Sequence, residues 1–101
     1  MTDAVLTLIA PAALKDDIAS ALLALPVIAR GGFTIHHVEG HGAAIDYDRV
    51  VEQVRGYTSV VEIVASAPEA DLHAALEAIG SEFAGRGIRW RIVAVEARGS
   101  I

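Results

Sequence analysis

The chain lacks cysteine, and its single methionine is the initial Met1. Disulfides, thiolate metal sites, cysteine nucleophiles and a methionine-rich copper(I) site are therefore excluded. Positive charge is also scarce, because 8 Lys and Arg stand against 13 Asp and Glu and leave a net charge of −5. That sign disfavours nucleic acid and anionic membranes as partners.

Long apolar runs are missing as well. No run approaches the roughly 20 residues that cross a bilayer, and residues 1–3 lack the positive start of a secretory signal. We therefore expect a cytoplasmic protein without membrane insertion. The length of 101 residues fits a single domain over residues 1–101. Because 53% of so short a chain is hydrophobic although only 5% is aromatic, we expect apolar surface to be left for another subunit.

The order of apolar residues predicts four strands and two helices. The strands are expected at residues 4–10, 33–39, 57–65 and 88–96. The helices are expected from Ala12 to the residue before Pro26, and from a capping box at Ser66–Glu69 to Phe83. The order β-α-β-β-α-β predicts a ferredoxin-like α+β fold, with a four-stranded antiparallel sheet and both helices on one face.

Strand alternation leaves the other face of the sheet, here called the open face, without helices. We assign to it Thr34, His36, Val38, Thr58, Val60, Glu62, Val64, Arg89, Arg91, Val93 and Val95. Five of these are valines. At about 25 cal/mol per Å² of apolar area, covering them contributes several kcal/mol, so we expect sheet-to-sheet self-association. The charged members then need one another as partners, because a buried unpaired charge is costly.

The connection between the second and third strands is long. It spans residues 40–56, 17 in all, whereas hairpins need about two to five. Candidate partner-binding side chains on it are Ile45, Tyr47, Val50, Val51 and Val54. Two interpretations stay open: a partner-binding loop that becomes ordered on contact, and a flap packed on its own or a neighbouring subunit.

A cluster of histidines precedes this loop. His37, Glu39 and His41 alternate along a strand and so point to one side, where imidazole and carboxylate groups suit zinc, copper(II), nickel or cobalt. Ordinary hydrogen bonding by strand-end histidines is the alternative interpretation. His73, one helical turn from Glu69, is expected to be a solvated i,i+4 partner.

A glycine turn precedes the last strand. Gly85, Arg86 and Gly87, followed by Arg89 and Arg91, offer backbone N–H groups and guanidinium groups that suit a phosphate. A helix terminator with solvated arginines is the alternative. No hydroxyl nucleophile stands beside a plausible base and no carboxylate pair is marked by its spacing, so we expect no enzymatic activity.

Five segments resemble the PII superfamily of trimeric signalling proteins. More closely, they resemble a proteobacterial PII-like family often encoded beside heavy-metal efflux pumps of the resistance-nodulation-division type. The segments are LTLIAPAAL (6–14), VEGHG (38–42), EQVRG (52–56), PEADL (68–72) and RWRIVAVE (89–96). The resemblance implies a homotrimer with its sheets facing inward. It also implies that loop 40–56 is a T-loop, with which PII proteins contact transporters and enzymes.

In PII proteins, effectors, usually adenine nucleotides, bind in clefts between subunits, where the loop base meets the glycine turn. The resemblance therefore implies a ligand site made of Gly40, Gly42, Gly85, Arg86, Gly87 and Arg89. Ile88 occupies the position of the lysine in the superfamily's G-D-G-K-I pattern, and Arg86 or Arg89 is the candidate replacement for its charge. The related CutA proteins, linked to divalent metal tolerance, share the architecture.

Three hypotheses follow. The first is a non-enzymatic PII-like sensor that binds a small effector and contacts a membrane transporter or its regulator through loop 40–56. The second is a CutA-like protein that binds divalent heavy metals. The third is a small dimeric enzyme on a ferredoxin-like scaffold, which the number of subunits distinguishes from the first.

Overall fold

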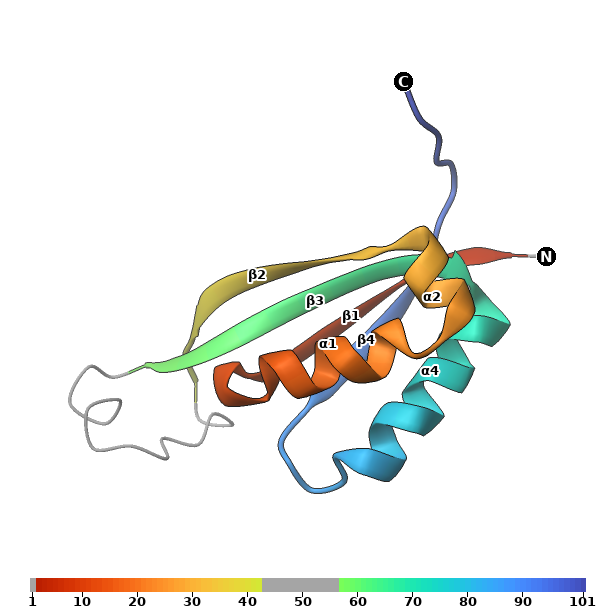
Figure 1. Cartoon of the computed structure of the whole chain (residues 1–101). Coiled ribbons are helices and arrows are strands. Elements are labelled where there is room, and N and C mark those ends of the chain that lie inside the picture. The colour runs from red at the N-terminus through yellow and green to blue at the C-terminus, as the bar shows by residue number, and fades with distance from the viewer. Residues whose placement is uncertain (1, 43–56) are drawn as a thin grey trace.

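The computed structural model describes residues 2–42 and 57–101. Its elements, drawn in Figure 1, are β1 (Asp3–Pro11), the 3₁₀ helix η1 (Ala12–Leu14), α1 (Lys15–Leu23), α2 (Pro26–Gly31), β2 (Phe33–Gly40), β3 (Thr58–Pro68), α4 (Glu69–Glu82) and β4 (Arg89–Ala94). Their order confirms the predicted ferredoxin-like α+β fold. Helix α2 is the addition that the sequence pattern did not indicate.

The four strands form one sheet in the order β2-β3-β1-β4. Every neighbouring pair is antiparallel. Strand β1 lies between β3 and β4, which is why its sequence is apolar at nearly every position. Strands β2 and β4 form the two edges of the sheet. Loop 40–56 connects β2 to its neighbour β3, so the base of the loop lies at one end of these two strands (Figure 1).

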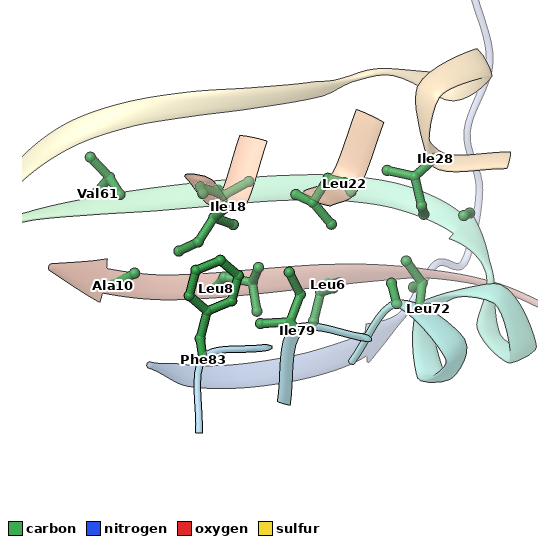
Figure 2. Close-up of a cluster of buried hydrophobic side chains, with 14 of the residues drawn as sticks. Leu6, Leu8, Ala10, Ile18, Leu22, Ile28, Val61, Leu72, Ile79 and Phe83 are labelled. Carbon is green, nitrogen blue, oxygen red and sulfur yellow. The ribbon is translucent and has the colours of Figure 1, made fainter. Parts of the chain in front are cut away.

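The hydrophobic core lies between the helices and one face of the sheet (Figure 2). Alternate residues of β1 and β3 are buried because successive strand side chains point to opposite faces. The largest fully buried side chains are Leu6, Leu8, Ile18, Leu22, Ile63, Leu72 and Val61. They come from β1, α1, β3 and α4, so one core joins both helices to the two central strands.

The structure corrects the sequence interpretation of Pro26. The first long helix does end before it, but Pro26 is also the first residue of α2. Leu25 is extended, with φ −97° and ψ 112°, as the residue before a proline prefers. Proline then suits the first helical position, where no backbone N–H donor is needed. Helix α2 buries Ile28 and ends at Gly31, and the C-cap residue Gly32 has a φ of 80°, which favours glycine.

The predicted capping box at Ser66–Glu69 is wrong. Strand β3 continues to Pro68, which is itself the N-cap of α4 and makes no side-chain capping bond. Ser66 still lies in the strand, opposite Val5, and its hydroxyl donates a hydrogen bond to the Ala4 carbonyl at 3.3 Å. The serine therefore links β3 to β1 instead of capping the helix.

The strand register confirms most of the assignments to the open face. One row across the sheet runs His36, Glu62, Ile9, Arg89, and the next runs Thr34, Val64, Thr7, Arg91. Val95 differs from the prediction because β4 ends at Ala94. Two valines of this face are exposed in the single chain, Val38 at 37% and Val93 at 55%.

Candidate ligand sites at the loop base and the glycine turn

A hollow of about 280 Å³ lies on the open face where β2 leads into loop 40–56. We call it the loop-base hollow. Its lining consists of Ile9, Val38, Glu39, Gly40, His41, Val60, Glu62 and Arg89. The strand register explains this grouping, because the end of β2 at Gly40 and the start of β4 at Arg89 lie at the same end of the sheet, with β3 and β1 between them. The fold therefore brings together two of the predicted ligand residues, Gly40 and Arg89, that are far apart in the sequence.

Among the described residues that line the loop-base hollow, Arg89 is the one cation. It is exposed and forms no ion pair with any residue in the described ranges 2–42 and 57–101. Its guanidinium group thus retains all of its donors for an anion, and a planar guanidinium binds carboxylate or phosphate through two parallel hydrogen bonds.

His41 is held at the start of the loop by two neighbours. Its Nε2 lies 3.1 Å from Glu39 Oε1, and its ring centroid is 5.6 Å from that of Tyr57, the first described residue after the loop. Glu39 and His41 are two of the three predicted metal ligands. His37 does not join them in a three-ligand group, and none of the described residues forms such a group.

A second hollow, of about 310 Å³, lies on the helix face of the sheet between α4 and β4. We call it the turn hollow. It is lined by Leu8, Leu76, Ile79, Gly80, Phe83, Ala84, Gly85, Arg86, Gly87, Ile88 and Trp90. Its rim is the predicted glycine turn, in which Gly85 and Gly87 have φ of 74° and 78°. These left-handed values explain the two glycines, since a side chain would strain the backbone there.

Trp90 is a side chain of the turn hollow that the predicted ligand site does not include, whereas Arg86 belongs to that site. Trp90 lies beside the buried Phe83 and is 56% exposed, which is high for so large an apolar side chain. Arg86 is exposed and, like Arg89, has no ion-pair partner in the part of the chain that the structure describes. Trp90 could have been chosen as a candidate from the sequence, because it is the one tryptophan of the chain.

The two hollows lie on opposite faces of the sheet and have none of the described lining residues in common. Alternation along β4 causes this separation, because Arg89 pairs with Ile9 on the open face whereas Trp90 pairs with Leu8 on the helix face. Within residues 2–42 and 57–101 of one chain, neither hollow therefore contains both the Gly40 and Arg89 pair and the Gly85–Gly87 turn. Gly42, also predicted, lies just beyond β2 with a φ of 121° and lines neither hollow.

Other predicted residues fall elsewhere. The partner-binding candidates Ile45, Tyr47, Val50, Val51 and Val54 lie outside the described residues. His73 Nε2 lies 3.6 Å from Glu69 Oε1, which confirms the i,i+4 pair on α4. No helix within residues 2–42 and 57–101 is both long and apolar enough to cross a membrane.

The sheet order, the helices on one face and the long connection after β2 define an α+β protein of the ferredoxin-like fold class. The sequence model of one family matches residues 1–101, and its description is "Protein of unknown function (DUF3240)". The chain belongs to the DUF3240 family. No curated protein matches it at a significant level.

Solved structures show the same fold. A crystal structure of a DUF3240 family protein from Shewanella baltica OS155 is 24% identical, with a TM-score of 0.78 over 100% of this chain and 98% of that chain. CPII, a nitrogen regulatory PII-like protein from Thiomonas intermedia K12, bound to ADP, AMP and bicarbonate, is 20% identical, with a TM-score of 0.72 over 100% and 98%. CPII bound to ADP, AMP and acetate is 19% identical, with a TM-score of 0.70 over 92% and 85%.

Proposed function

We propose that this protein is a non-enzymatic, cytoplasmic PII-like sensor. It forms a homotrimer through the open face and binds an adenine nucleotide in clefts between subunits. Loop 40–56 contacts a membrane transporter or its regulator. The observation that carries the proposal is the fold shared with CPII, a nitrogen regulatory protein bound to ADP and AMP, together with two arginines, Arg86 and Arg89, that have no partners among the described residues.

The separation of the two hollows supports a site between subunits. A nucleotide that contacts both the loop base and the glycine turn needs groups from opposite sheet faces, and one chain offers these in separate hollows. When three open faces meet in a trimer, the β2 edge of one chain lies beside the β4 edge of the next, which brings the loop-base hollow of one chain near the turn hollow of its neighbour. Arg89 then binds a phosphate beside Gly40, and the backbone N–H groups of Gly85 and Gly87 bind a second one.

Ligand binding at the loop base also gives a route to regulation. Gly40, Glu39 and His41 line the loop-base hollow and lead directly into loop 40–56. A nucleotide that touches them has different affinities for different loop conformations, and this difference is what allows a ligand to shift a conformational equilibrium. We propose that Ile45, Tyr47, Val50, Val51 and Val54 make the contacts with the partner protein.

Calorimetry with ATP, ADP, AMP and cyclic AMP tests the nucleotide site. We expect binding of at least one of them, and Arg89→Ala to weaken it by at least about 10-fold, because a hydrogen bond to a charged group contributes roughly 1.5–3 kcal/mol. The matched control is Arg30→Ala, which removes the same charge from an exposed position on α2. Absence of heat with all four nucleotides, or equal weakening by both variants, would overturn the nucleotide proposal.

A divalent metal is the second candidate ligand, and the Glu39–His41 pair favours it. The two side chains are already 3.1 Å apart, so they can approach one ion, while His37 or a neighbouring subunit supplies further ligands. Titration with Zn²⁺, Cu²⁺, Co²⁺ and Ni²⁺ tests this proposal. We expect His41→Ala to reduce affinity at least about 10-fold, in the range seen when metal-site partners are lost, and His73→Ala on α4 to leave it unchanged. Equal affinity of wild type and His41→Ala would contradict the metal site.

A further inference from the structure

We propose that Glu62 of one subunit forms an ion pair with Arg91 of the neighbouring subunit across the open face. This inference rests on the self-association proposed above and adds the contact that fixes how the sheets are aligned. Arg91 lies outside the proposed nucleotide and metal sites, and Glu62 lines the loop-base hollow.

The surroundings of Glu62 make it the critical charge of the open face. Its side chain lies between Val60 and Val64 along β3 and between His36 and Ile9 across the sheet. It is half-buried even in a single chain and has no ion-pair partner among residues 2–42 and 57–101. If a second sheet covers this face, the carboxylate loses its water, and the cost is large unless a cation replaces it.

The same face provides the cation, but two strands away. Arg89 and Arg91 lie on β4, and β1 separates them from β3. Adjacent strands are about 4.8 Å apart, so the backbones of β3 and β4 are separated by roughly 10 Å. The open face of each chain thus has an acidic centre and a basic edge, which makes two copies complementary to each other when the edge of one lies over the centre of the other.

The positions of the two arginines favour Arg91. Among the residues assigned to the open face, Glu62 is the one carboxylate and Arg89 and Arg91 are the two arginines. Arg89 lines the loop-base hollow, where the nucleotide phosphate is proposed to bind, and Arg91 does not. Arg91 instead lies beside Thr7 in the adjoining row, with an exposed side chain that has no ion-pair partner in the described ranges. A buried pair of this kind sets the alignment of partners more than it adds affinity.

A charge exchange tests the ion pair. The association of the full-length wild type, Glu62→Arg, Arg91→Glu and the double variant is measured by analytical ultracentrifugation over a range of concentrations. We expect each single variant to dissociate at protein concentrations roughly 100-fold higher than wild type, the loss expected when one partner of a buried pair is removed. The double variant restores association to within about 10-fold of wild type. Far-UV circular dichroism verifies that each variant is folded.

Two controls reverse the same charges outside the open face. Glu77→Arg on α4 and Arg30→Glu on α2 are exposed, and we expect neither to alter association. If the wild type itself is monomeric, both the proposed trimer and the ion pair are excluded. If the wild type associates but the single variants associate equally well, only the ion pair is excluded. Rescue of Glu62→Arg by Arg89→Glu and not by Arg91→Glu would overturn the assignment of Arg91.

Discussion

Val93→Lys is expected to convert the assembled protein into folded monomers at micromolar concentration. Val93 lies on the open face and is 55% exposed in the single chain, so a lysine there leaves the core of the monomer intact. In the assembly, burial of that lysine costs several kcal/mol per subunit. Arg91 lies two residues away on the same face and cannot neutralise it. Analytical ultracentrifugation gives the mass, and circular dichroism reports the fold.

Leu23→Lys is the matched control. Leu23 is 58% exposed on α1, on the helix side of the sheet, so this change replaces an aliphatic side chain of nearly equal exposure with the same cation. We expect Leu23→Lys to associate as the wild type does. Assembly of Val93→Lys with wild-type affinity would show that the open face is not the interface, and the proposed site between subunits would then lose its basis.

Leu22→Ala is expected to lower the free energy of unfolding by about 2–5 kcal/mol. Leu22 is 1% exposed and projects from α1 into the core between α1 and the sheet (Figure 2). Removing its side chain leaves a cavity that the surrounding strands and helices fill only in part, so both packing and transfer free energy are lost. For a small domain this is a large share of the total stability. Urea denaturation followed by circular dichroism measures it.

The neighbouring residue is the control for this second prediction. Leu23→Ala makes the same chemical change in the same helix at an exposed position, and we expect a change within about 0.5 kcal/mol. All samples need the same protein concentration, because association stabilises the folded state by mass action. Similar losses from Leu22→Ala and Leu23→Ala would contradict the placement of the helix on the sheet.

The strands and their faces were predictable because their signals are local. Alternation placed His36 and Glu62 on one face, and the structure pairs them directly across β2 and β3. Helix α2 was missed because Pro26 both ends one helical pattern and begins another, and the pattern alone does not separate these roles. The capping box failed for a tertiary reason: the Ser66 hydroxyl donates to a carbonyl of β1, far away in the sequence.

The candidate sites were predictable only in part. The residue types identified Arg89 and the Gly85–Gly87 turn, since cations and left-handed glycines have clear sequence signals. Their placement in two hollows on opposite faces depends on where β4 begins and which face each residue of it takes. The contribution of Ile9 and Glu62 to the loop-base hollow depends on pairing between distant strands, which has no local signature.

The exposed indole of Trp90 has a practical consequence. Because it is the one tryptophan in the chain and lines the turn hollow, its fluorescence reports on this part of β4 without a label. An occupant that displaces water from the ring shifts the emission to shorter wavelength. Titrations followed by this signal therefore detect a ligand that reaches Trp90, whether from the turn hollow or from beside Arg89 and Arg91.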